Sequence, residues 1–191
     1  MSDSTASNGA EITREALHTR SITISGYRRS DGLYEVEGRL LDTKPIDFRP
    51  PSDERMVRAG EAIHHMGVRI VFDVEMTVRD VIAITDSAPY AACHGAPPTL
   101  KSLVGLRMAS GWSAEVKRRL SGAASCVHLA GLMVPMAATA FQSMSLHRLQ
   151  QAEPMQGATP AKIDSCLAYA RHGDLVKRRW PKFFIAKADQ A

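Results

Sequence analysis

The feature that most constrains the fold is a strongly alternating run at residues 66–73. Its apolar members are Met66, Val68, Ile70 and Phe72. Side chains alternate across a strand, so these four fall on one face, and His64 continues the same parity. A strand with one apolar face is stable only when another layer covers that face. The run therefore predicts a strand of a half-buried sheet, with a histidine near its start.

The rest of the chain supplies partners for this strand. Period-two patterns at 21–27 and 34–40 flank the turn residues Ser30-Asp31-Gly32 and predict a hairpin, and a further strand is predicted at 78–85. Residues 42–58 hold three prolines and are expected to form a connection. The later patterns are helical. A short helix is predicted at 98–105, a second at 113–120 capped by Ser113, and a long one from 125 to about 150 capped by Ser125. A last element is predicted to begin at residue 160 and to carry Cys166. The predicted fold is α+β, a small antiparallel sheet packed on one side by three to four helices.

Length and composition suit one ordinary domain. The chain has 191 residues, of which 45% are apolar and 23% charged, enough to bury a core. We expect a disordered N-terminal tail over 1–19, a single domain over 20–185 and a short tail over 186–191. No internal repeat or second domain is predicted.

Charge and hydropathy bear on location and partners. The net charge is +4, with Lys and Arg scattered, and we interpret the basic group at 177–182 as a solvated edge rather than a nucleic-acid site. No stretch of about 18 apolar residues and no secretory-type start is present. The three cysteines are an odd, widely spaced number, which favours reduced thiols. These features predict a cytoplasmic protein that binds neither nucleic acid nor membrane, and a homo-oligomer is compatible with them.

Cysteines and histidines at the ends of predicted elements are the candidate functional residues. Cys126 falls at a predicted helix start, where free amide N–H groups favour an anionic thiolate. Cys93 follows a predicted strand and precedes a Gly/Pro loop. Thiolate and imidazole are the usual ligands of zinc and are common ligands of iron. One hypothesis is thus a metal-binding protein in which His64, Cys93 and Cys126 hold zinc or iron and leave a fourth position open.

Two other interpretations of the same residues stay open. In the first, the protein is a metal-independent enzyme with Cys126 as nucleophile and His64 or His128 as base, acting on a thioester or related carbonyl substrate. His128 is roughly 200° around an ideal helix from Cys126, so the two converge only at an irregular helix start. In the second, the cysteines simply pack as small buried residues in a binding or assembly protein.

Several short motifs resemble those of a known family. They are Tyr27-Arg28-Arg29-Ser30-Asp31-Gly32-Leu33, His64-His65-Met66, Ala88-Pro89-Tyr90 with Cys93, Leu103-Val104-Gly105-Leu106, Gly111-Trp112, Cys126-Val127-His128-Leu129 and Asp164-Ser165-Cys166. Together they resemble the uncharacterised bacterial domain-of-unknown-function 2889 family, from which the chain departs at Ser125, where that family usually has glycine. The resemblance implies a fold group and the setting of an accessory protein or enzyme near aromatic or lipid catabolism, but no specific activity.

The order of elements is also similar to the NifU-type iron–sulfur scaffold proteins. That resemblance implies a NifU-like fold, with Cys93 and Cys126 at two of the scaffold's cysteine positions and His64 near its aspartate. The first scaffold cysteine would fall near Ala62, and the Cys-Gly-Asp triplet is absent. The resemblance thus implies a single zinc or iron ion more readily than a bridging cluster.

Overall fold

The computed structural model describes residues 12–51, 56–95, 97–145, 147, 159–160 and 162–186. The chain divides into two compact units, Met1–Ser145 and Leu146–Ala191. The single domain expected over 20–185 stays a prediction, as does the disorder of the N-terminal tail, most of which lies outside the described residues.

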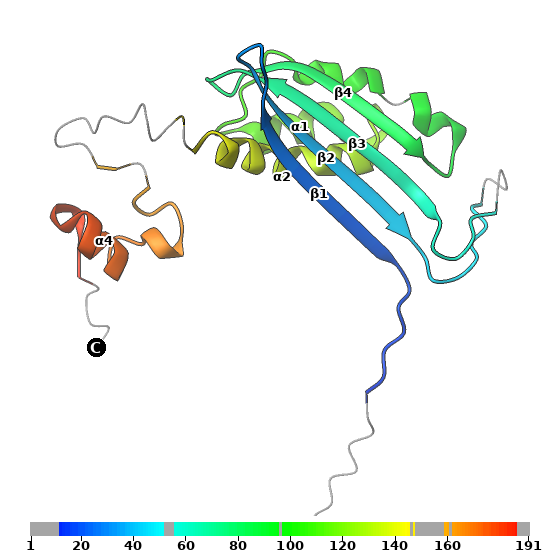
Figure 1. Cartoon of the computed structure of the whole chain (residues 1–191), viewed down its shortest axis with the longest axis horizontal. Helices are drawn as coiled ribbons and strands as arrows, with labels where there is room; N and C mark the ends of the chain where they lie inside the picture. The colour runs from blue at the N-terminus through cyan, green and yellow to red at the C-terminus, as the bar shows by residue number, and fades with distance from the viewer. Residues whose placement is uncertain are drawn as a thin grey trace, which may run out of the picture. The chain divides into compact units, whose positions relative to one another are not determined.

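The first unit is built on a four-stranded antiparallel sheet in the order β1-β2-β3-β4 (Figure 1). The strands are β1 Thr19–Arg28, β2 Tyr34–Thr43, β3 Ala62–Phe72 and β4 Val78–Ser87. All four predicted strands are therefore present, and each is longer than its alternating pattern. β3 begins at Ala62, so His64 lies inside the strand and not ahead of it. The predicted α+β class with an antiparallel sheet is confirmed.

The strand register gives the sheet one apolar face and one charged face. Ile24 is opposite Gly38, Gly38 is opposite Val68, and Val68 is opposite Ala83. Directly opposite residues project from the same face, so these rows share it. The fully buried strand residues on this face include Val36, Met66, Val68, Ile70 and Phe72. The predicted apolar parity of β3 is thus confirmed.

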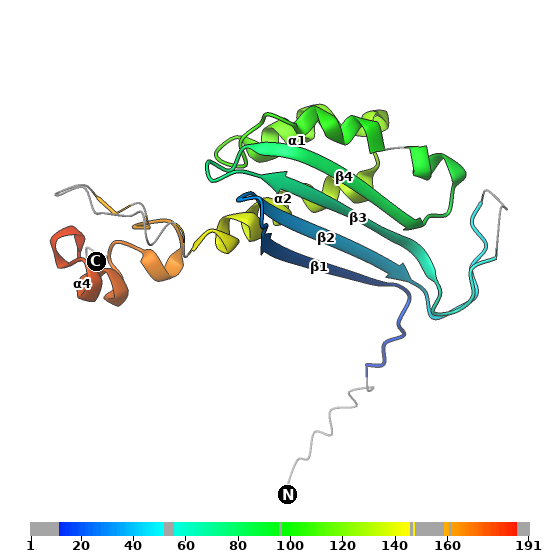
Figure 2. The same ribbon diagram turned by 45° about the horizontal axis from the view of Figure 1, so that its top comes forward.

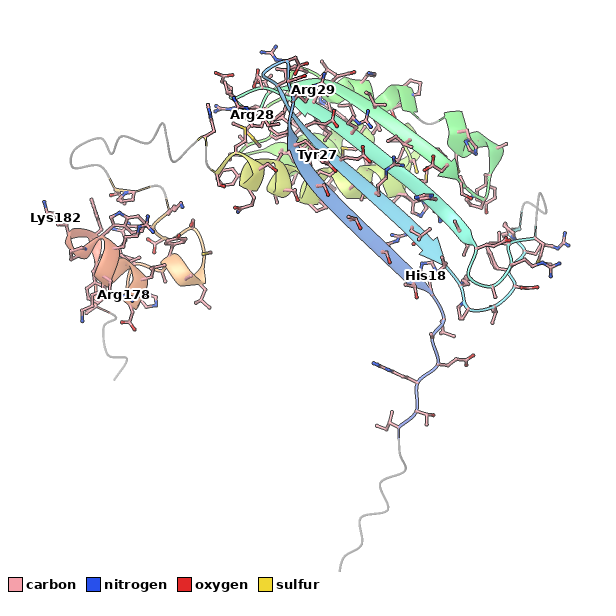
Figure 3. The ribbon with its side chains drawn as sticks, in the orientation of Figure 1. His18, Tyr27, Arg28, Arg29, Arg178 and Lys182 are labelled. Carbon is pink, nitrogen blue, oxygen red and sulfur yellow. The ribbon has the colours of Figure 1, made fainter. Side chains whose placement is uncertain are left out.

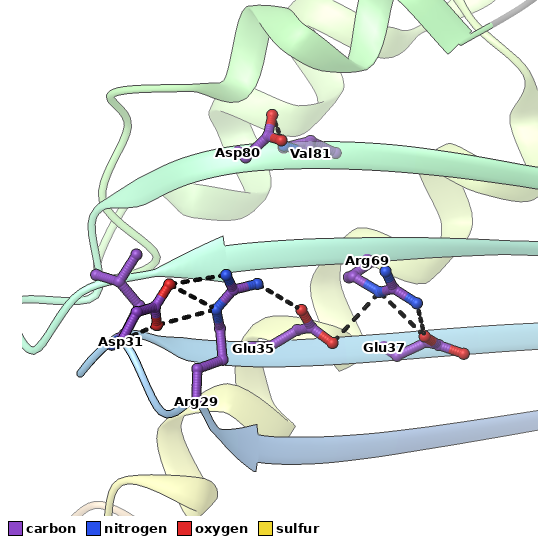
Figure 4. A network of polar contacts seen from close by, with 8 residues as sticks. Arg29, Asp31, Glu35, Glu37, Arg69, Asp80 and Val81 are labelled. Carbon is purple, nitrogen blue, oxygen red and sulfur yellow. Dashed lines mark hydrogen bonds and ion pairs between the residues drawn. The ribbon is translucent and has the colours of Figure 1, made fainter.

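The opposite face of the sheet carries a row of ion pairs. Arg29 donates to Asp31 and to Glu35, and Arg69 donates to Glu37 (Figure 4). These side chains are partly or largely exposed, and such pairs contribute little stability individually. A sheet with one packed and one solvated face is typical of antiparallel topology.

Two α-helices and a 3-10 helix cover the apolar face. They are α1 Trp112–Leu120, α2 Val127–Ser143 and η2 Pro97–Leu103, and Figures 1 and 2 show α1 and α2 on the same side of the sheet. The buried stripe of α2 consists of Leu129, Leu132, Met133, Met136 and Ala140. Trp112 Nε1 donates to the Met133 carbonyl at 2.9 Å, which links α1 to α2 inside the core.

The helix caps differ from those expected. α1 follows Gly111, whose φ of 88° suits glycine, so Ser113 lies inside the helix. α2 follows Cys126, so Ser125 is one residue outside it and its buried hydroxyl has no hydrogen-bond partner among the described residues. α2 ends at Ser143 and Met144 forms a turn, so the predicted helix is interrupted there; Ser145 and His147 are again helical, and the predicted end near residue 150 lies outside the described residues.

The second unit holds short helical pieces. They are η4 Leu167–Tyr169, α4 Asp174–Arg179 and η5 Pro181–Phe183. Val176 is fully buried, and the Tyr169 and Trp180 rings lie 6.0 Å apart. Cys166 is exposed just before η4, and Gly173 caps α4.

Candidate metal centre

The site begins with a buried carboxylate at the end of β2. Asp42 is fully buried and lies on the helix-covered face, one row beyond Leu40. The ladder between β2 and β3 shifts at Asp42/Thr43, and such irregularities often re-aim a side chain at a site. Arg20, directly opposite on β1, donates to both carboxylate oxygens at 2.7 and 2.8 Å. Burial alone would raise the pKa of Asp42, but the Arg20 guanidinium outweighs it and lowers that pKa to about 2.

Two imidazoles share the same carboxylate. His64, opposite Asp42 on β3, places Nδ1 2.9 Å from Oδ2, and His18 places Nε2 3.2 Å from Oδ1. Figure 3 shows His18 at the entry to β1. An ionised carboxylate only accepts hydrogen bonds, so His64 holds its proton on Nδ1 and leaves Nε2 as an acceptor. Burial lowers the pKa of His64, and Asp42 opposes that shift only in part.

The first turn of α2 brings a third histidine. The His128 ring centroid is 3.9 Å from that of His64, with the planes tilted by 37°. Burial lowers the pKa of His128, and the neighbouring His64 and Arg20 lower it further. Asp42, His64 and His128 each offer one ligand atom, and these atoms all lie within 4.8 Å of one another. Among the described residues this is the group whose donors could share one metal ion.

The residues predicted from sequence are only partly assembled. His64 and His128 belong to this group, whereas Cys93 and Cys126 do not. Cys126 is half-buried beside it, with Sγ 3.8 Å from His128 Nδ1, and Cys93 lies in the 3-10 helix η1, Ala91–Gly95. Asp42 was missed, because the predicted strand stopped at residue 40. Its parity was the available signal, since an acidic residue that continues an apolar stripe has to find a buried partner.

An open hollow lies in front of the histidine pair. Its volume is about 390 Å³. Its lining residues are His18, Arg20, Asp42, Lys44, Phe48, Pro50, Pro51, Ile63, His64, Pro89, Tyr90 and His128. The buried carboxylate of Asp42 and the half-buried imidazoles of His64 and His128 therefore have access to solvent through a largely apolar recess.

The family comparison agrees with the motifs. Residues 18–142 match the family model described as a protein of unknown function, DUF2889. The chain belongs to that family. No curated protein and no solved structure matches it, so the likeness to NifU-type scaffolds stays a prediction.

The DUF2889 segment contains the whole candidate site. His18 and His128 both fall within the matched residues, and so do Asp42, His64 and Cys126. The second unit, with Cys166, lies beyond the matched segment. In the part of the chain that the structure describes, no helix is long and apolar enough to cross a membrane.

Proposed function

We propose that this DUF2889 protein binds one zinc or iron ion, with His64 and His128 as direct ligands and Asp42 as the group that orients His64. The observation that carries the proposal is the meeting of three donors from β2, β3 and α2 within 4.8 Å. Imidazole is a usual ligand of zinc and of non-haem iron, and a carboxylate that orients a ligating histidine is common at such sites. This ligand pair retains His64 from the sequence hypothesis and replaces the two cysteines with His128, while Asp42 has an orienting role.

The hydrogen bonds of Asp42 decide its part in such a site. A carboxylate has about four lone-pair positions, and Arg20 fills two of them while His18 and His64 fill the others. Asp42 would have to release one of these partners to bind an ion directly. A carboxylate that holds Nδ1–H of a histidine leaves the opposite nitrogen free for metal, which is a common arrangement around metal sites. Any further ligand of the ion would have to reach it from the hollow, which His64 and His128 line.

Metal analysis of untagged protein tests the proposal. Wild type should take up about one zinc or iron ion per chain after reconstitution, and His64→Ala and His128→Ala should abolish uptake. Asp42→Asn should weaken affinity by roughly 10–100-fold, as expected of a group that orients a ligand. His65→Ala is the matched control, because His65 is on the other face and pairs with Asp86 at 3.6 Å.

The cysteine variants separate this ligand set from the one that the sequence suggested. Cys93→Ser and Cys126→Ser should leave uptake unchanged. Loss of the ion in either variant, with retention in His128→Ala, would show that the sulfurs are the ligands. Wild-type protein that stays metal-free after reconstitution with zinc and with ferrous iron would refute the site altogether.

A second candidate function is favoured by the pair of Cys126 and His128. The thiol sits at the N-terminus of the 17-residue helix α2, and its sulfur is 3.8 Å from an imidazole nitrogen. Both features suit a cysteine nucleophile acting on a thioester without a metal. Iodoacetamide below pH 7 should then label Cys126 ahead of Cys166, although Cys166 is the more exposed. Labelling in order of exposure would contradict this function.

A further inference from the structure

We propose that the hollow beside His64 and His128 binds an organic anion with a flat apolar body and a single carboxylate. The inference rests on the proposed function, because the bound molecule would lie against the two histidines assigned to the ion. The inference goes beyond the proposed function by naming the class of small molecule that the site binds.

The walls of the hollow are apolar and partly planar. They come from the connection after β2, the start of β3 and the segment after β4. The wall residues are Phe48, Pro50, Ile63, Pro89 and Tyr90. The rings of Phe48 and Tyr90 offer flat contact area, and apolar walls with few polar groups are typical of small-molecule sites. An apolar body of planar shape is the ligand that these walls fit.

The charge of the hollow selects an anion. Arg20 is committed to Asp42 through two hydrogen bonds, so these two charges offset each other. Lys44 is the remaining cation in the lining, and none of the described carboxylates is paired with it. Its Nζ lies 5.5 Å from the centre of the Phe48 ring. A carboxylate attached to a flat body would reach Lys44 while its ring contacts the wall.

The size of the hollow limits the ligand. A volume of about 390 Å³ is near the lower end of the range of roughly 300–1,000 Å³ for small-molecule sites. A fused pair of aromatic rings with one carboxylate fits this space, so 2-naphthoate is a suitable probe. The amide 2-naphthamide has the same shape without the charge, and it isolates the contribution of Lys44.

Calorimetric titration of the full chain with both probes tests the inference. Metal-free protein in chelator and zinc-loaded protein should be titrated separately. We expect 2-naphthoate to bind at least 10-fold more tightly than 2-naphthamide. Lys44→Met should remove that preference, while Lys44→Arg should keep it. Lys117→Met is the matched control, because Lys117 is in α1, outside the hollow.

The two preparations keep this inference separate from the metal proposal. A carboxylate preference that depends on Lys44 supports the anion site in either preparation, whether or not His64→Ala still binds zinc. Equal affinity for the two probes, no binding of either probe in both preparations, or an unchanged preference in Lys44→Met would overturn it. Far-UV circular dichroism of Lys44→Met and Lys44→Arg establishes that both variants are folded before titration.

Discussion

Replacing Asp42 with asparagine should destabilise the protein in a way that depends on pH. The carboxylate is fully buried, and its pKa falls from 3.8 to about 2 because Arg20 outweighs the effect of burial. At about 1.4 kcal/mol per pKa unit, this difference corresponds to about 2 kcal/mol of stability at neutral pH. Arg20 is 43% exposed and can turn to water, which limits any further loss. We expect Asp42→Asn to lower the free energy of unfolding by about 2–3 kcal/mol at pH 7.

The sign of the pH dependence follows from which state takes up the proton first. As pH falls below about 4, the carboxyl group of the unfolded chain is protonated, while the folded chain keeps its carboxylate until about pH 2. The contribution of Asp42 is therefore complete above pH 4 and is lost between pH 4 and pH 2. The difference in stability between wild type and Asp42→Asn should therefore shrink between pH 4 and pH 2.

Urea unfolding followed by far-UV circular dichroism at pH 7, 5, 3.5 and 2.5 measures this difference. Asp86→Asn is the control: Asp86 also accepts from an arginine, Arg39, at 3.0 Å, but it is 48% exposed. Exposed pairs contribute about 0–1 kcal/mol, so the control should differ little from wild type. Equal losses in the two variants at pH 7, or a loss in Asp42→Asn that persists undiminished at pH 2.5, would refute the reasoning.

Three further predictions concern packing and titration. Gly26→Ala should lower the free energy of unfolding in urea by about 1–3 kcal/mol, because a Cβ there would come within 1.7 Å of Ser143 Oγ. A Cβ at Gly131 would meet nothing within 4 Å, so Gly131→Ala should stabilise α2 by about 0.5–1 kcal/mol. Trp112→Phe should cost about 1–3 kcal/mol at pH 7, because a buried carbonyl loses its indole donor. The imidazole of His64 should titrate by NMR below 6.5, so stability should fall as pH decreases from 6.5 and should fall less in His64→Gln.

The sheet could be predicted from sequence because its signal is local. Period-two alternation located all four strands and assigned the buried face of β3 correctly. An antiparallel sheet with one buried face requires apolar residues at every second position of its strands, and this alternation is visible in the sequence. The ends of the elements were less accurate. Cys126 replaced Ser125 as the cap of α2, an offset of one residue. β3 extends back to Ala62 because Ala62 pairs with Thr43 of β2, and such pairing is not visible in the local pattern.

The candidate site was predicted only in part because it depends on pairing between strands. His64 could be selected from its parity, and His128 from its place at a helix start. Asp42 could not be matched to them, since nothing local shows that residue 42 is opposite residue 64. Cys93 was selected for its position after a strand, but the chain turns into η1 there, and the sulfur is not among the clustered donors.

The geometry of the site is a consequence of the register that builds the core. Arg20, Asp42 and His64 form one cross-strand row on the covered face, and the adjacent row contains Leu40 opposite the buried Met66. Because side chains alternate with a period of two, a slip of one residue between β2 and β3 would move Leu40 and Asp42 together to the solvated face. Such a slip would expose a buried apolar row, so the core itself holds the carboxylate against the histidine. The donors of the site are therefore placed by the same apolar contacts that stabilise the sheet.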